Sequence, residues 1–225
     1  MNLLALDTST EYCSVALLRG EELTYREAHA VQRHSELVLP MIEDLLAVAG
    51  MKPKGLDGIA FGAGPGSFTG VRIACGVAQG LAFGTGVPVV PVGTLVALAQ
   101  ETGASRVIAC IDARMGEVYH AVYRREGAGW TQVAAPGVGP AQSAPAVEGD
   151  GWFGCGSGFA AYADALTERY AGQLGGGIAA ELHPHARSIA RLALPMLSVG
   201  QGLSAEQAAP LYVRDKVALK MREQR

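Results

Sequence analysis

Residues 3–28, LLALDTSTEYCSVALLRGEELTYREA, decide the fold of this chain. The apolar run at residues 3–6 ends in Asp7, which is typical of a buried strand that delivers a carboxylate to a site. A second apolar run follows at residues 13–18, and a turn at residues 19–21 leads into a third at residues 23–28. The sequence therefore predicts a meander of three strands at the start of the chain.

The spacing of the apolar residues changes after this meander. Residues 35–49 carry apolar side chains every three or four positions, which predicts an amphipathic helix. Ser35 is its expected N-cap, and Pro40 should kink the helix or move its start. Two more pairs of elements follow, each a strand and then a helix. The strands are expected at residues 58–62 and 87–92, and the helices run from the glycine-rich loop to about residue 82 and over residues 94–100. Such an order is that of a ribonuclease-H-like unit.

The same plan then begins again. Residues 107–112 (VIACID) repeat the pattern of residues 3–7, and the strands expected at residues 118–124 and 130–134 repeat the second and third strands. The alternative is that any two hairpins look alike. We favour an internal duplication, and predict an α/β fold of two ribonuclease-H-like subdomains, residues 1–102 and 103–225, with mixed sheets flanked by helices and a ligand cleft between them.

The rest of the second subdomain is expected to be less regular. Residues 136–149 are rich in Pro, Gly, Ala and Ser and predict a surface connection. Helices are expected at residues 159–170 and 186–198, separated by a glycine-rich break at residues 175–177. The tail after about residue 204 has two expected features: it packs back on the first subdomain, and its last dozen residues are mobile.

Composition excludes several classes of function. The formal net charge of the 225 residues is -3, so the chain lacks the cationic excess of a protein that holds nucleic acid by itself. Hydrophobic residues make up 49%, enough for an aliphatic core. The four cysteines lie far apart and three are in apolar runs, which indicates buried thiols in a cytoplasmic protein.

Neither an export signal nor a membrane span is expected. The N-terminus lacks a basic region and reaches Asp7 before a signal sequence could form. Residues 73–100 carry no charge, as in a membrane span, but glycines and prolines interrupt this stretch repeatedly. We therefore expect a soluble protein with no membrane partner.

The glycine-rich loop at residues 62–70 invites a nucleotide-binding interpretation. A phosphate-binding loop needs Lys and then Ser or Thr after its last glycine, whereas Gly70 is followed by Val71 and Arg72. The loop does not fit the dinucleotide fingerprint either. We favour a structural turn into a helix that Ser67 or Thr69 caps, with anion binding as the alternative.

A second group of candidate residues occupies the positions of the nucleotide-binding loops of actin-like ATPases. These loops are weak copies, because Asp7 is not followed by the glycine that lets backbone amides approach a phosphate. We predict a vestigial nucleotide site, formed by Asp7, Thr8, Ser9, Asp112, Gly154, Gly156 and Ser157. No catalytic or metal-binding residue is predicted, since the histidines form no HExxH motif and no GxSxG motif occurs.

Two helices carry more apolar surface than one sheet face needs. Gly76 and Gly80 lie four residues apart and give their helix a smooth face that another helix can approach closely. We predict a partner interface on this face, formed by Leu37, Met41, Leu45, Val71, Ile73, Gly76, Val77 and Gly80. The alternative is that these residues pack only on their own sheet.

Several stretches together resemble one family. LALDTSTEYCSVALL, GPGSFTGVRI, VPVVPVGTL, DARMGEVY and the terminal PLYVR resemble the bacterial TsaB (YeaZ) family of tRNA threonylcarbamoyladenosine biosynthesis proteins. The resemblance covers nearly the whole chain and implies an actin/Hsp70-like (ASKHA) fold. It also implies a role in placing threonylcarbamoyl on the adenosine next to the tRNA anticodon.

Partners follow from the same resemblance. Family members are not the catalyst; their paralogue TsaD is, and it binds a metal through an HxxxH motif that has no counterpart at residues 92–98 here. The implied partners are TsaD, the ATPase TsaE, a second copy of the chain and, through the complex, tRNA. ATP or ADP at the interface of the complex is a candidate cofactor. The competing interpretation is an enzyme that acts alone, either an actin-like ATPase or a glycoprotease-like peptidase.

Overall fold

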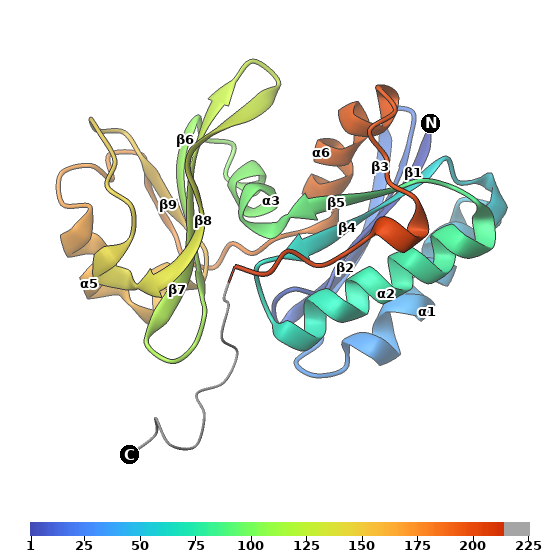
Figure 1. The fold of residues 1–225 in the computed structure, drawn as a ribbon, viewed down its shortest axis with the longest axis horizontal. Coiled ribbons are helices and arrows are strands. Elements are labelled where there is room, and N and C mark those ends of the chain that lie inside the picture. The colour runs from blue at the N-terminus through green and yellow to red at the C-terminus, as the bar shows by residue number, and fades with distance from the viewer. Residues whose placement is uncertain (214–225) are drawn as a thin grey trace.

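The described part of the chain contains two five-stranded sheets, each flanked by helices (Figure 1). The structure is a computed structural model, and it describes residues 1–213. The last dozen residues, for which the sequence predicts mobility, lie outside the described part. The predicted α/β class with mixed sheets is confirmed.

The first sheet has the order β3-β2-β1-β4-β5. Its antiparallel meander consists of β1 (Asn2–Asp7), β2 (Tyr12–Arg19) and β3 (Glu22–His29). Two parallel strands extend it, β4 (Gly58–Gly64) next to β1 and β5 (Val89–Gly93) next to β4. The apolar run of β1 is fully buried because both faces of the sheet are covered.

Helices cover both faces of the first sheet. On one face lie α1 (His34–Val48) and α2 (Phe68–Thr85), and on the other lies α6 (Ala186–Ser198), as Figure 1 shows. A short helix, α3 (Thr94–Glu101), follows β5 and packs between the two halves. A 3-10 turn, η1 (Pro53–Gly55), precedes β4.

The second sheet repeats this topology with the order β8-β7-β6-β9-β10. Its meander consists of β6 (Arg106–Asp112), β7 (Glu117–Glu126) and β8 (Gly129–Pro140), and the parallel strands are β9 (Phe153–Cys155) and β10 (Gly177–Ala179). The remaining elements are η2 (Ala141–Ser143), α4 (Gly158–Ala161) and α5 (Ala163–Arg169). Two sheets of the same strand order confirm the predicted duplication.

Three local predictions were wrong. Strand β8 does not end at Ala134 but continues to Pro140, because a register shift near Val122 lets Glu117 pair with Pro140. The helix expected at residues 159–170 is divided into α4 and α5, since Tyr162 leaves the helical conformation (φ -132°, ψ 43°). Ser35 does not cap α1, which starts one residue earlier.

The chain returns to the first half after the second sheet. Helix α6 packs on β1, β2 and β4, so it covers the first sheet although the sequence assigned it to the second subdomain. The 3-10 turn η3 (Ala205–Gln207) follows, and Gln79 on α2 donates a hydrogen bond to the Ala208 carbonyl (2.9 Å). Leu211 then donates its N–H to the Ala63 carbonyl (2.7 Å). The boundary between residues 102 and 103 stays a prediction.

Candidate functional site

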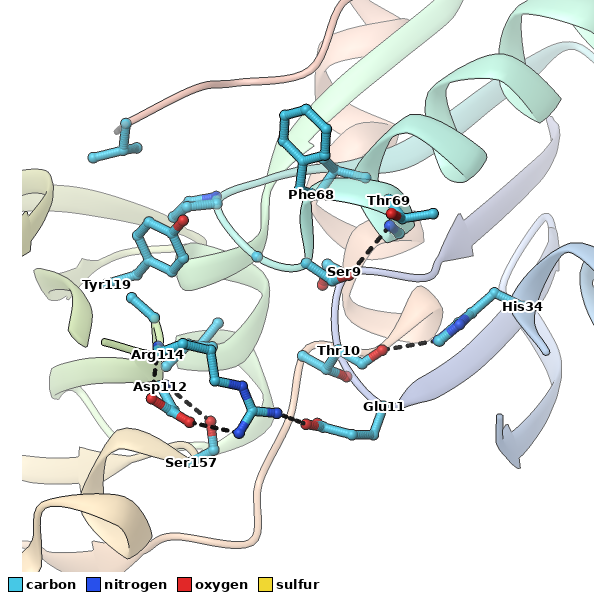
Figure 2. Close-up of a pocket in the computed structure, with 18 of the residues that line it drawn as sticks. Ser9, Thr10, Glu11, His34, Phe68, Thr69, Asp112, Arg114, Tyr119 and Ser157 are labelled. Carbon is cyan, nitrogen blue, oxygen red and sulfur yellow. Dashed lines mark hydrogen bonds and ion pairs between the residues drawn. The ribbon is translucent and has the colours of Figure 1, made fainter. Parts of the chain in front are cut away.

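A cleft of about 1160 Å³ lies between the two halves (Figure 2). Its walls on the first half are the β1–β2 turn and the start of α2, and those on the second half are the β6–β7 turn and the start of α4. Leu211, Tyr212 and Val213 also line it. The predicted cleft between two duplicated halves is therefore present, at the carboxyl ends of β1 and β6.

The glycine-rich loop forms one wall by packing on the β1–β2 turn. Ser67 donates its N–H to the Ser9 carbonyl (2.7 Å), and Thr8 Oγ1 donates to the Gly70 carbonyl (2.7 Å). A side chain at Gly70 would collide with this turn, since a Cβ there would lie 1.9 Å from the Thr8 carbonyl oxygen. Ser67 Oγ accepts from the Gly70 N–H, which confirms Ser67 as the N-cap of α2. The glycines of this loop thus allow its backbone to lie close to the backbone of the β1–β2 turn.

Asp7 points away from the cleft. Its Oδ1 accepts hydrogen bonds from the N–H and Oγ of Ser9 (3.0 and 2.9 Å), while Oδ2 is buried without a hydrogen-bond partner. The space over Gly62 is filled by this Oδ2. Burial raises the pKa of the Asp7 carboxyl to about 6, and the bonds from Ser9 oppose that rise. A neutral carboxyl is therefore favoured more strongly here than in an exposed aspartate.

Asp112 occupies the equivalent position in the second half, but it faces the cleft. Its Oδ1 accepts from the Arg114 N–H (2.8 Å) and from the Tyr162 hydroxyl (3.2 Å), and its Oδ2 pairs with the Arg114 guanidinium (3.1 Å). Arg114 also reaches across the cleft to Glu11 (3.1 Å), as Figure 2 shows. Both oxygens of this carboxylate are therefore occupied by groups of the chain.

The predicted nucleotide-site residues divide into two sets. Ser9, Asp112 and Ser157 line the cleft, and Ser157 Oγ accepts from the Asp112 N–H (3.0 Å). The others are absent from its lining: Asp7, Thr8, Gly154 and Gly156. Both of these glycines let neighbouring elements approach closely, because a Cβ at Gly154 would strike Phe159 and one at Gly156 the Cys110 carbonyl.

The predicted partner face also divides. Gly76 and Gly80 are exposed on α2 with open space around each, and Leu37, Met41, Ile73 and Val77 are half-buried beside them. Leu45 lies in the core instead, since its position on α1 faces the sheet, and Val71 is buried at the start of α2, where it lines the cleft.

Sequence reasoning missed two aromatic residues on this face. Phe83 is 78% exposed, and Phe68 is 48% exposed under the guanidinium of Arg72, whose Cζ lies 3.3 Å from the ring centre. The sequence does contain a signal for Phe68, because Phe68, Arg72, Gly76 and Gly80 follow one another at intervals of four residues.

Relatives identify the family. TsaB of Haemophilus influenzae, a tRNA threonylcarbamoyladenosine biosynthesis protein, is 40% identical over 98% of this chain and 96% of its own length. TsaB of Escherichia coli is 38% identical over 98% of this chain and 97% of its own length. Residues 27–146 match the family model described as "TsaD: tRNA N6-adenosine threonylcarbamoyltransferase". The chain belongs to the TsaB family and to the wider group that this model defines.

Solved structures agree with membership of the TsaB family. YeaZ from Pseudomonas aeruginosa is 43% identical, with a TM-score of 0.86 over 94% of this chain and 99% of its own. A second structure, of a Pseudomonas aeruginosa protein with similarity to peptidase YEAZ, gives 43% identity and a TM-score of 0.87 over 95% and 99%. This TsaB-family chain is thus one of the tRNA threonylcarbamoyladenosine biosynthesis proteins, and its ribonuclease-H-like fold is that of YeaZ.

The cleft of this TsaB-family chain has an unusual backbone that the sequence did not predict. Val31, Arg114 and Met115 all have a positive φ of 53 to 62°, and all three line the cleft. Side chains other than glycine adopt this conformation at a cost, which is tolerated where the surroundings hold it. Strain of this kind gives no sequence signal, because Val and Met are disfavoured in it.

Two features are absent from residues 1–213, the part of the chain that the structure describes. Within that range, no group of three His, Cys, Asp or Glu side chains has the arrangement of a metal site. No helix in the same range is long and apolar enough to cross a membrane.

Proposed function

We propose that this chain is a non-catalytic scaffold and activator subunit of the assembly that forms tRNA threonylcarbamoyladenosine, in which it pairs with TsaD and works with the ATPase TsaE. The observation that carries the proposal is the open face of α2, where Gly76 and Gly80 leave the helix backbone exposed. A helix of another subunit can approach such a face more closely than one covered by long side chains. The half-buried apolar side chains beside it supply a water-excluding contact.

The reactive groups of the chain support a scaffold more than an enzyme. Burial raises the pKa of the thiols of Cys13 and Cys110 to about 12, so neither is ready to act as a nucleophile. In the cleft, Asp112 is held by Arg114 and Tyr162, and Glu11 is paired with Arg114. These polar groups stabilise the contact between the halves.

The net charge of the chain supports tRNA binding by the whole complex rather than by this subunit alone. The formal net charge of -3 gives no surplus of cations with which this subunit would hold a polyanion by itself. Phosphate contacts then come chiefly from the partner. In the absence of TsaD, the same α2 face pairs two copies of this chain, in the cytoplasm where tRNA is modified.

Gly76→Trp tests the proposal. Cells depleted of the protein are rescued with the natural chain, with Gly76→Trp, or with Gly139→Trp as the matched control. A Cβ at either glycine meets nothing within 4 Å, so both positions can carry a side chain in the isolated chain. We expect the natural chain and the control to restore threonylcarbamoyladenosine in tRNA, measured by nucleoside mass spectrometry, and Gly76→Trp to restore less than roughly a tenth.

Two results would count against the scaffold. Rescue by Gly76→Trp with undiminished capture of TsaD would show that the interface lies elsewhere. Unchanged modification in depleted cells would remove the chain from this process altogether.

Because the cleft is large, the alternative function is that of an actin-like ATPase that acts alone. A ligand that binds only the folded state raises its melting temperature. We expect the isolated chain to show no steady hydrolysis of ATP in the presence of magnesium. A large upward shift in melting temperature together with turnover would favour the ATPase.

A further inference from the structure

The connector between the second sheet and α6, residues 180–185, lies against the edge of the first sheet. His183 stacks on Tyr12 of β2, with ring centres 3.7 Å apart and planes 4° from parallel. Its Nε2 lies 2.8 Å from Glu27 Oε2 on β3. The same carboxylate oxygen lies 3.2 Å from Nε2 of His185. Glu27 thus joins two histidines of the connector to the first half.

Backbone contacts fix the proton on one of these rings. His185 Nδ1 accepts the N–H of Arg187 (2.9 Å) at the start of α6, so its ring proton must be on Nε2, which faces Glu27. Burial lowers the pKa of His185 to about 4, in agreement with a neutral ring. A metal on Nε2 would require a proton on Nδ1, where the Arg187 N–H already points. His183 is therefore hydrogen-bonded to Glu27, whereas His185 Nε2 is buried close to the same carboxylate oxygen without a hydrogen bond to it.

The His183 ring is the more exposed of the two. The His183 side chain is 22% exposed, against 4% for His185. Its Nδ1 lies 3.3 Å from the Glu181 carbonyl oxygen, so both ring nitrogens face acceptors. Two protons on this ring satisfy both acceptors and add an ion pair with Glu27, whereas a neutral ring satisfies only one.

The connector forms part of the wall of the cleft region. Residues 180–184 line a small cavity of about 60 Å³ together with Thr10, Glu11, Ile111 and Ser157. Those four residues also line the large cleft. Movement of the connector away from β2 and β3 therefore changes the surroundings of both walls of the cleft.

We propose that Glu27, His183 and His185 form a pH-sensitive latch, in which the charged His183 ring holds the connector against the first sheet and its neutral form releases it. The latch stands independently of the scaffold role. Other titratable or charged groups surround it on every side, namely Asp7 on β1, Tyr12 on β2, Tyr25 and His29 on β3, Glu101 on α3, Glu181 in the connector and Arg187 on α6.

Hydrogen exchange of the full chain tests the latch. Amide exchange of peptides that cover residues 180–185 is measured by mass spectrometry at about pH 5.5 and about pH 8.5, corrected for the intrinsic rate. We expect the corrected rate in the natural chain to be roughly fivefold faster at the higher pH. His183→Gln keeps a donor but cannot become charged, so in an Asp7→Asn background, where the Asp7 carboxyl no longer titrates, its rate should be the same at both values.

His29→Gln is the matched control, because the His29 ring also contacts Tyr12 (centres 5.1 Å apart). It should retain the pH dependence of the natural chain. Equal corrected rates at both pH values in the natural chain would overturn the latch. A pH dependence that survives in His183→Gln in the Asp7→Asn background, or that disappears in His29→Gln, would overturn it as well, since another group would then be titrating.

Discussion

Gly70→Ala is expected to destabilise the folded chain by about 3 kcal/mol or more, the upper end of the cost of substitutions that force a packed backbone to move. The added Cβ would lie 1.9 Å from the Thr8 carbonyl oxygen and 3.0 Å from its carbon. Neither atom can rotate away, because both belong to the main chain of the β1–β2 turn. Separation of the turn from α2 would also weaken the bond from Thr8 Oγ1 to the Gly70 carbonyl. Urea unfolding followed by circular dichroism measures the change.

Gly80→Ala on the same helix is the control for this prediction. Gly80 is exposed and has open space around it, so a Cβ meets nothing there. Alanine is the better helix former by roughly 0.5 to 1 kcal/mol, and we expect stabilisation of that size. Equal and small changes for Gly70→Ala and Gly80→Ala would show that the turn yields easily and that the close contact is unimportant.

Gly70 shows how much of a motif's role can be inferred from the sequence. The absence of the Lys and Ser or Thr of a phosphate loop was enough to reject that function for residues 62–70 and to expect a turn and a cap. The reason for the glycines was not accessible, because Thr8 is 62 residues from Gly70 in the chain. Local patterns identify a turn, whereas the backbone it must touch depends on the tertiary fold.

Periodicity predicted the elements better than it predicted their surroundings. The apolar spacing located α6 at residues 186–198, with the bounds that the structure shows. The spacing did not predict that α6 packs on the first sheet, because an apolar stripe indicates only that a helix packs on some core. For the same reason Leu45 and Gly76 were assigned to one face, although Leu45 is buried and Gly76 is exposed.

The duplicated halves differ at their equivalent aspartates, Asp7 and Asp112. Both follow the first strand of a meander, and the sequence treated both as candidates for one ligand site. Asp112 lines the cleft and pairs with Arg114, which in turn reaches Glu11 of the first half, whereas Asp7 has turned inward under Gly62. A carboxylate with an unpartnered buried oxygen contributes nothing to ligand binding from that position, but it makes folding sensitive to pH.

Asp7→Asn is expected to remove this sensitivity. The Asp7 pKa is about 6 in the folded chain and 3.8 for an ordinary aspartate, so the folded state holds the proton more tightly. Its contribution to stability is therefore complete below about pH 4, and it is lost as the pH rises through about 6. The difference corresponds to about 3 kcal/mol. The free energy of unfolding of Asp7→Asn minus that of the natural chain should therefore be larger, in favour of the folded variant, by that amount at about pH 8 than at about pH 4.

Asp112→Asn separates this effect from a general response to lost charge. Asp112 accepts bonds from Arg114 and Tyr162, so the amide should lower stability at about pH 8 by roughly 1 kcal/mol or less, the size expected for a partly exposed ion pair. Urea unfolding at both pH values measures both variants. If Asp7→Asn changes stability equally at the two values, the folded chain tolerates the ionised Asp7 carboxylate. In that case either water reaches Oδ2, or Ile189, whose Cδ1 lies next to the site, shifts and exposes it.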